Sequence, residues 1–225
     1  MKKTTVLVSV PNEGVIQESV SEVVEKLVRD GRYKVEVIRP KDRPYESNLC
    51  KIVKRFRAEG HDFWLNIDHD NPPLRNPLDL VLYDRDIVGF PTPVWAWAKA
   101  DQERDYPIYW NAYDYLSDQD TYVEHSPKKG LQRVNAVGSG CFMVARRVFQ
   151  DQRMQTSPFQ RLWNKDGTMR RSADLEFCRR SESCGFKVYA HFDYPCDHIK
   201  TLSLTEIRQA FQKFYSHQNQ EEMAV

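Results

Sequence analysis

Two carboxylates with the spacing of a cation site, Asp68 and Asp70, directly follow a segment typical of a buried strand, Asp62 to Ile67. Carboxylate oxygens suit Mg²⁺ or Mn²⁺, and such an ion then bridges the phosphate oxygens of a substrate. An ordinary acidic loop is the alternative, because the same spacing recurs at Asp84-Arg85-Asp86 and Asp118-Gln119-Asp120. Only the first pair follows a strand in the half of the chain where strands and helices alternate, so we select Asp68 and Asp70 as the candidate site.

The elements that must position this pair alternate through the first half of the chain. β-branched and apolar runs predict strands over 4–10, 33–38 and 62–67, and helical spacing of apolar residues predicts helices over 15–29 and 49–58. A β-α-β-α-β order of this kind favours a mainly parallel sheet with right-handed crossovers. Ligands of such sheets bind at the carboxyl ends of the strands.

The second half is more varied. It contains predicted strands over 87–90, 131–137, 141–145 and 186–191, predicted helices over 172–184 and 205–217, and a Trp- and Tyr-rich stretch over 91–120. The aromatic rings are either half-buried packing or stacking faces for sugars or bases. No linker divides the chain. We therefore expect one domain over 1–225, with a nucleotide-binding half at 1–90, an acceptor and catalytic half at 91–200, and a C-terminal helix and tail at 201–225.

Further motifs follow in a fixed order along the chain. They are Pro11-Asn12-Glu13-Gly14, Gly138-Ser139-Gly140-Cys141, the helix start Ser172-Ala173-Asp174-Leu175-Glu176, Gly185-Phe186-Lys187-Val188-Tyr189, and Cys196-Asp197-His198. In this order and spacing, roughly residues 4–200 resemble the GT-A-fold glycosyltransferases, in particular small stand-alone bacterial and phage members of the family 2-like group. The resemblance implies an α/β GT-A (nucleotide-diphospho-sugar transferase) fold, with a Rossmann-like, mainly parallel central sheet, flanking helices and a small antiparallel portion.

The resemblance also implies roles for the acidic residues. Asp68 and Asp70 would lie next to the metal and the ribose, with Asp70 the direct ligand of Mn²⁺ or Mg²⁺ and His198 a further ligand. A surface histidine is the alternative for His198. Asp174 would be the general base that deprotonates the acceptor hydroxyl; a helix N-terminal acid that interacts with the helix dipole is the alternative, and both can hold together.

The nucleotide sugar would contact a second set of residues. These are Pro11, Asn12 and Glu13 at the base and ribose, Asp42 or Arg43 at the base or phosphates, Asn48 and Gly140. The chain departs from the family pattern at three places. Ala173 stands where an acid is common, Ser47 where an arginine is common, and the segment Arg39 to Pro44 replaces an Asp-Asp-Gly-Ser motif, which leaves the donor nucleotide open.

Charge is balanced over the whole chain but not along it. Among 225 residues, 33 Lys and Arg stand against 32 Asp and Glu, which excludes binding of polyanions through bulk charge alone. Residues 126–180, however, carry 12 Lys and Arg and only four Asp and Glu. A solvated face is the usual meaning of such a run. Because it surrounds the candidate base, we also consider a polyanionic acceptor.

Composition and apolar runs predict where the protein works. A 40% hydrophobic content allows a packed core, and no apolar run approaches the roughly 18 residues that span a bilayer, so we expect no integral membrane association. The short apolar stretch Val6 to Val10 does not fit a secretory signal. Five cysteines without a CxxC pair favour reduced thiols. We expect a cytoplasmic protein of a bacterium or a phage-infected cell.

Three functions are compatible with these features. The first is a metal-dependent, inverting glycosyltransferase that uses a nucleotide-diphosphate sugar, UDP-sugars foremost, and a polyanionic acceptor such as phage DNA with hydroxymethylated pyrimidines, whose target base would have to be flipped. The second is the same enzyme acting on a saccharide or lipid-linked acceptor. The third is an inactive protein that only binds nucleotide sugars, an alternative that the alanine at position 173 keeps open.

Overall fold

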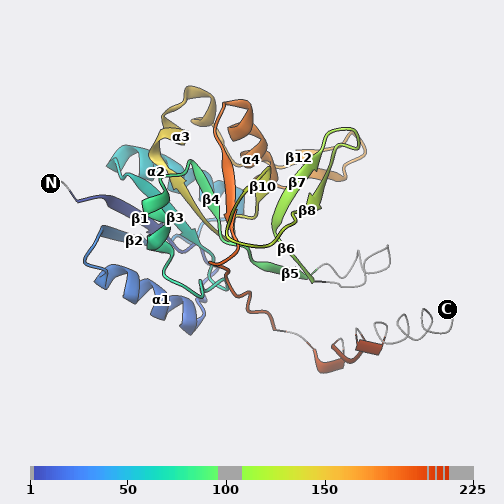
Figure 1. Cartoon of the computed structure of the whole chain (residues 1–225), viewed down its shortest axis with the longest axis horizontal. Helices are drawn as coiled ribbons and strands as arrows, with labels where there is room; N and C mark the ends of the chain where they lie inside the picture. Colours follow the sequence, from blue (N-terminus) through green and yellow to red (C-terminus); the bar gives the residue numbers. More distant parts are fainter. Residues whose placement is uncertain (1–2, 96–107, 202, 206, 210, 213–225) are drawn as a thin grey trace.

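A seven-stranded sheet forms the centre of the computed structural model, which describes residues 3–95, 108–201, 203–205, 207–209 and 211–212 (Figure 1). The strand order is β2-β1-β3-β11-β4-β14-β9. The strands are β1 (Thr5–Ser9), β2 (Lys34–Ile38), β3 (Phe63–Ile67), β4 (Ile87–Gly89), β9 (Leu131–Val134), β11 (Cys141–Ala145) and β14 (Val188–His191). β11 and β9 run antiparallel to their neighbours and the other five strands share one direction, which confirms the predicted mainly parallel sheet.

Helices cover both faces of this sheet. α2 (Tyr45–Glu59), α3 (Arg146–Gln150) and α4 (Ala173–Ser183) pack on one face, and α1 (Glu18–Arg29) and the 3₁₀ helix η1 (Pro77–Tyr83) pack on the other. Side chains of a strand alternate between the two faces, as β3 shows: Trp64 belongs to the core under α2, α3 and α4, whereas Phe63 and Leu65 belong to the core over α1. The molecule therefore has three layers (Figure 1), with an apolar core on each face of the sheet.

Shorter antiparallel elements surround one end of the sheet. The 3₁₀ helix η3 (Gln152–Met154) follows α3 and is not one of these elements. The antiparallel elements are the sheet β10-β7-β8 (Ala136–Val137, Ala112–Leu116, Thr121–Glu124), the pair β5-β6 (Pro93–Trp95, Ile108–Trp110) and the pair β12-β13 (Leu162–Trp163, Met169–Arg171). This is the predicted small antiparallel portion, and its strands β7 and β8 project from the body of the molecule in Figure 1.

Several predicted boundaries differ from the structure. α1 begins at Glu18 rather than at position 15, because Gln17 is extended and donates its backbone N–H to the carbonyl of His69 (2.9 Å). α2 begins at Tyr45, four residues earlier than predicted. The single strand predicted over 131–137 is wrong: Asn135 interrupts it, accepts a hydrogen bond from the Tyr115 backbone on Oδ1 (3.0 Å), and separates β9 and β10 into different sheets.

The C-terminal segment agrees with the prediction only as far as it is described. Residues 204, 205, 207–209, 211 and 212 are helical, with Leu204 and Phe211 exposed, whereas 213–217 lie outside the described residues. Trp97 and Tyr106 of the aromatic stretch also lie outside them. In the part of the chain that the structure describes, no helix has the length and apolar character to cross a membrane. The five cysteines are free thiols.

Candidate functional site

A cleft of about 390 Å³ lies at the carboxyl ends of β1 and β3. Its volume falls in the range of small-molecule sites. Ten of the predicted site residues line it: Pro11, Asn12, Glu13, Asp42, Asn48, Asp68, Asp70, Gly140, Asp174 and His198. The eleventh, Arg43, does not line it; its side chain is 68% exposed and pairs with Glu13 at 2.8 Å. The fold thus gathers residues that are up to 187 positions apart, from Pro11 to His198, around one cavity.

Asp68 is held from two sides within the cleft. Its Oδ1 accepts hydrogen bonds from the Tyr45 hydroxyl (2.7 Å) and from Asn66 Nδ2 (3.1 Å). Its backbone N–H donates to the carbonyl of Gly140 (2.7 Å). Among the described residues Oδ2 has no hydrogen-bond partner, so one oxygen of this carboxylate remains available to a ligand.

The hydrogen bonds that orient Asp68 continue into the core. Asn66 also donates to the carbonyl of Ser139 (2.8 Å), and its Oδ1 accepts from the Ser9 hydroxyl (2.7 Å). The Ser9 hydroxyl in turn accepts from Trp64 Nε1 (2.8 Å). Asn66, Ser9 and Trp64 are fully buried. Because each polar group of this chain is satisfied, the network fixes the carboxylate of Asp68 relative to the sheet.

Burial alters the proton affinity of both partners at this position. Desolvation in the cleft raises the pKa of Asp68 to about 7, although the hydrogen bonds from Tyr45 and Asn66 oppose this shift. Burial, followed by the nearby Asp68 carboxylate, raises the pKa of Tyr45 well above its usual value. A charge at Asp68 is therefore costly unless a cation compensates it.

Asp70 has the opposite environment. Its side chain is 11% exposed, and its Oδ2 lies 2.5 Å from Lys200 Nζ and 3.6 Å from His198 Nε2. Burial alone would raise the pKa of Asp70, but His198 and Lys200 outweigh it and hold that pKa below its usual range. Asp70 is thus ionised and already balanced by a positive charge.

His198 has the orientation of a metal ligand. Its Nδ1 lies 2.7 Å from the carbonyl oxygen of Pro93, which only accepts, so Nδ1 carries the proton. Nε2 faces Asp70 Oδ2 at 3.6 Å, and it is the nitrogen that a metal at this position would bind, because a carbonyl already fixes the other nitrogen. A carboxylate with an imidazole suits a divalent cation such as Mn²⁺. The residues present therefore fit the metal that the resemblance implies.

Asp174 lies in the first turn of α4 and also lines the cleft. Its Oδ1 accepts a hydrogen bond from the Ser172 hydroxyl and another from the backbone N–H of Leu175 (3.0 Å). The next acid along the helix, Glu176, is instead bound to the buried Arg171 (2.7 Å) and does not line the cleft. Ala173 packs into the core under the helices, so an acid at that position would be buried.

Close backbone approach explains the glycines of the turn between β10 and β11. A Cβ atom at Gly140 would lie 2.7 Å from Asn71 Oδ1, and one at Gly138 would lie 2.3 Å from Asn111 Nδ2. Both contacts are shorter than any tolerated by a real Cβ. Glycine at these two positions therefore lets the turn lie close to the side chains of Asn71 and Asn111, which a larger residue would displace.

Polar side chains on the nucleotide side of the cleft are largely engaged. Asn12 accepts on Oδ1 from the Gly14 backbone (3.0 Å) and donates to the carbonyl of Val10 (3.0 Å), and Asp42 pairs with Lys51. Asn48 is buried, and its Oδ1 has no hydrogen-bond partner in the described part of the chain. Asn12 and Asp42 therefore shape this wall, while Asn48 retains an unused acceptor.

Sequence reasoning missed three functional candidates: Tyr45, Asn66 and Lys200 all contact Asp68 or Asp70. Asn66 had a signal, because it is a polar residue inside an otherwise apolar strand. Tyr45 was placed before the predicted start of its helix. Lys200 follows the Cys196-Asp197-His198 motif by two residues, but nothing in its local sequence indicates a partner 130 positions away.

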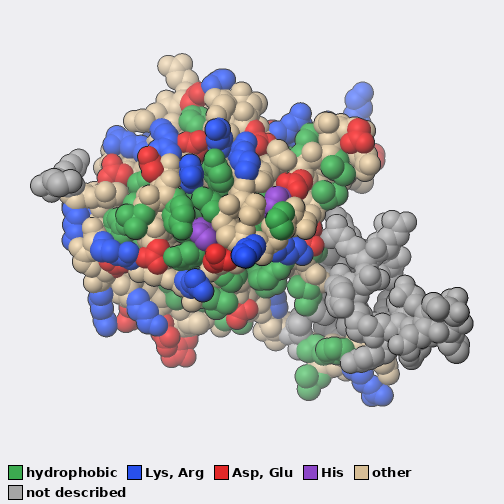
Figure 2. All heavy atoms as spheres, in the orientation of Figure 1, with side chains coloured by type: hydrophobic (Ala, Val, Ile, Leu, Met, Phe, Trp, Pro, Cys, Tyr) green, Lys and Arg blue, Asp and Glu red, His purple; other side chains and the backbone are tan. Residues whose placement is uncertain are grey.

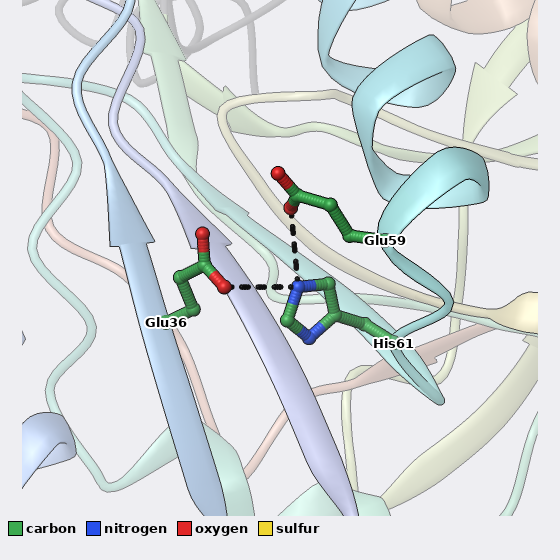
Figure 3. Close-up of side chains that lie close together, drawn as sticks. All are labelled: Glu36, Glu59 and His61. Carbon is green, nitrogen blue, oxygen red and sulfur yellow. Dashed lines mark hydrogen bonds and ion pairs between the residues drawn. The ribbon is translucent and has the colours of Figure 1, made fainter.

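A second group of donor atoms lies at another position in the fold (Figure 3). One oxygen of Glu36 on β2 and one of Glu59 at the end of α2 each lie 3.3 Å from His61 Nε2. Among the described residues, this is the group of three whose donor atoms all lie within 4.8 Å of one another. The donor atoms of Asp68, Asp70 and His198 lie farther apart. Arg55, however, donates to both glutamates (2.8 and 2.6 Å), so a cation is already present. We assign this cluster to packing of α2 against the sheet.

The basic segment 126–180 is largely neutralised in space. Carboxylates pair with seven of its 12 basic residues, which are Lys128, Arg133, Arg147, Arg153, Arg161, Arg170 and Arg171. Arg146 and Arg180 donate to backbone carbonyls. Over the face of the whole molecule drawn in Figure 2, Lys and Arg are interspersed with Asp and Glu. The excess of positive charge counted along the sequence therefore does not become an equally strong excess on the surface of the folded protein.

Comparison with known proteins extends the fold description. The sequence matches no protein-family model and no curated protein sequence. Among solved structures, A197 from STIV superposes with a TM-score of 0.58 at 12% identity, over 88% of this chain and 86% of that chain. GalNAc-T7, crystallised with UDP, GalNAc and Mn²⁺, superposes with a TM-score of 0.52 at 14% identity, over 89% of this chain and 44% of that chain. At such identities the likeness is one of fold, and the chain has an α/β GT-A fold and resembles small stand-alone proteins of that group.

Proposed function

We propose that this protein is a metal-dependent glycosyltransferase that moves a sugar from a nucleoside-diphosphate sugar, a UDP-sugar foremost, to an acceptor hydroxyl. One observation carries the proposal: the Asp70–His198 pair and the carboxylate of Asp174 line the same cleft at the carboxyl edge of the sheet. A structural neighbour of this fold was crystallised with UDP, GalNAc and Mn²⁺, which makes this ligand class the first to test.

On the donor side, Asp70 and His198 would hold Mn²⁺ or Mg²⁺. When bound, that ion supplies positive charge where the leaving diphosphate gains negative charge in the transition state. Pro11, Asn12 and Glu13 would line the base and ribose, and Asn48 lies on the same side of the cleft. Gly138 and Gly140 also line the cleft, so a diphosphate bound there would lie near their backbone.

On the acceptor side, Asp174 would accept the proton of the incoming hydroxyl. The acceptor oxygen then forms a bond to the anomeric carbon while the bond from that carbon to the diphosphate oxygen breaks. The Leu175 N–H and the Ser172 hydroxyl hold Oδ1, so Oδ2 is the basic oxygen. If Asp174 and the diphosphate lie on opposite sides of the sugar, the product is inverted, which NMR of the anomeric proton would determine.

The pairing of charges favours a saccharide or lipid-linked acceptor over DNA. In the segment 126–180, five basic residues lack a carboxylate partner among the described residues, and two of these, Arg146 and Arg180, are occupied by carbonyls. Three remain for a polyanion, whereas sequence-independent DNA binding usually relies on many phosphate contacts. Hydroxymethylpyrimidine-bearing DNA remains the second candidate, and its test is the salt dependence described in the Discussion.

Release of nucleoside diphosphate tests the proposal directly. The purified protein would be incubated with a panel of UDP-sugars and candidate acceptors, with Mn²⁺ or with EDTA. We expect metal-dependent release that Asp70→Ala abolishes while Asp118→Ala, an exposed acid with the same Asp-x-Asp spacing, leaves it unchanged. Metal-dependent binding of UDP-sugars without release on any acceptor would instead favour the inactive binding protein. Turnover by Asp70→Ala would refute the metal assignment.

A further inference from the structure

Lys200 contacts the same carboxylate oxygen that the candidate metal ligand His198 faces. Lys200 Nζ lies 2.5 Å from Asp70 Oδ2, and His198 Nε2 lies 3.6 Å from that oxygen. The side chain of Lys200 is 49% exposed, whereas that of Asp70 is 11% exposed. An ammonium group thus approaches Asp70 from the cleft and neutralises the charge that a divalent cation would use.

Backbone hydrogen bonds fix the residues before Lys200, whereas the side chain of Lys200 is half exposed. Three backbone bonds hold the preceding residues: Cys196 N–H to the carbonyl of Pro91 (2.9 Å), Asp197 N–H to Pro72 (3.0 Å) and Ile199 N–H to Asp70 (2.9 Å). Among the described residues, Asp70 is the partner of the Lys200 ammonium. The long side chain of Lys200 can therefore leave Asp70 without any change in the backbone segment that carries His198.

We propose that Lys200 is a gate for the cation and a ligand of the diphosphate. In the free protein, the ammonium group of Lys200 competes with Mn²⁺ for Asp70. When Mn²⁺ displaces it, the ammonium group stays in the cleft, where the positive charge of the metal would repel it. A nucleoside diphosphate supplies the negative charge that both cations need. The metal alone should therefore bind weakly, and the metal with the diphosphate should bind strongly. This inference rests on the proposed function, because it requires a diphosphate ligand.

The test compares Lys200→Gln with Lys187→Gln, a matched loss of charge at an exposed residue whose ammonium group has no ion-pair partner among the described residues. Binding of Mn²⁺ alone would be measured by the loss of the free-ion EPR signal, and binding of UDP in saturating Mn²⁺ by calorimetry. We expect Lys200→Gln to bind Mn²⁺ about tenfold more tightly and UDP about tenfold more weakly, with Lys187→Gln unchanged. Changes of the two affinities in opposite directions would identify the gate, because a purely structural defect would weaken the binding of both Mn²⁺ and UDP.

The outcomes separate this inference from the proposed function. If the unmodified protein binds Mn²⁺ and UDP, and Lys200→Gln changes neither or weakens both, the gate is wrong and the transferase proposal stands. If neither the unmodified protein nor Lys200→Gln binds UDP with Mn²⁺, the proposed function fails and the gate fails with it. A thermal unfolding curve for each variant would show that the comparison is made on folded protein.

Discussion

Asp68 is a partly buried carboxylate whose desolvation should destabilise the metal-free protein at neutral pH. Desolvation raises its pKa to about 7 in the folded protein, whereas a carboxylate of an unfolded chain titrates near 4. Asp68→Asn keeps the shape and an oxygen that accepts from Tyr45 and Asn66, but it has no charge to bury. We therefore expect the variant to be more stable than the unmodified protein above pH 7.

The size and sign of the effect follow from proton linkage. The unfolded chain loses this proton first, so the stability that a protonated Asp68 provides is complete below about pH 4 and is lost as the pH rises toward 7. Each pH unit in that interval lowers the free energy of unfolding by about 1.4 kcal/mol. Between pH 5 and pH 8, the free energy of unfolding should therefore fall by about 2 to 3 kcal/mol in the unmodified protein relative to Asp68→Asn.

Urea unfolding in EDTA at pH 5 and pH 8 measures this difference directly. In the comparison between variants, the contributions of the histidines and the other carboxylates to the pH dependence cancel. Asp118→Asn controls for the loss of one exposed acid. Mn²⁺ at pH 8 should then stabilise the unmodified protein by more than it stabilises Asp68→Asn. An equal stability difference at the two pH values would refute the argument, because it would mean that Asp68 is ionised in the folded protein at pH 5.

Three further outcomes test other parts of the structure. Asp174→Asn should lower turnover by about two to four orders of magnitude with UDP affinity unchanged; a loss confined to UDP affinity, measured by calorimetry, would give Asp174 a binding role. Phe177→Ala should lower the free energy of unfolding in urea by about 3 to 5 kcal/mol, since this ring is 2% exposed and lies 4.4 Å from that of Phe159; a cost below about 1 kcal/mol would contradict the core assignment. For DNA bound through the segment 126–180 alone, the logarithm of the binding constant should fall with the logarithm of salt concentration with a slope no steeper than about −3, because three cations of that segment have no carboxylate or carbonyl partner among the described residues; a slope near −8 would show that DNA contacts many more cations and would restore the polyanion hypothesis.

The sequence was most informative where local pattern and chain direction act together. A β-α-β order requires the ends of its parallel strands to meet at one edge, so Pro11 to Glu13 after β1 and Asp68 to Asp70 after β3 could be placed together before any coordinates were known. Asp174 at a helix start and His198 near the end of the fold also line the cleft. Their chemical roles remain predictions.

Long-range contacts could not be predicted in the same way. Lys200 meets Asp70 across 130 positions, and Tyr45 meets Asp68 only because α2 begins four residues before the apolar pattern does. The break in the strand at Asn135 likewise depends on partners in β7 and α4, which its neighbours in the sequence do not reveal. Each of these features depends on a polar group whose partner comes from a different element.

The electrostatics of the second half illustrate the same physical limit. Counted along the sequence, residues 126–180 form a basic segment. Counted in space, Arg147 pairs with Asp84 and Asp86, and Arg161 pairs with Glu46, 115 positions away. A window on the sequence includes the arginines but omits the carboxylates that the fold brings to them. Because the field at a surface is the sum over neighbours in space, an acceptor class argued from a sequence window must be re-examined once ion pairs are known. Here, that sum moves the expected acceptor from a polyanion toward a saccharide.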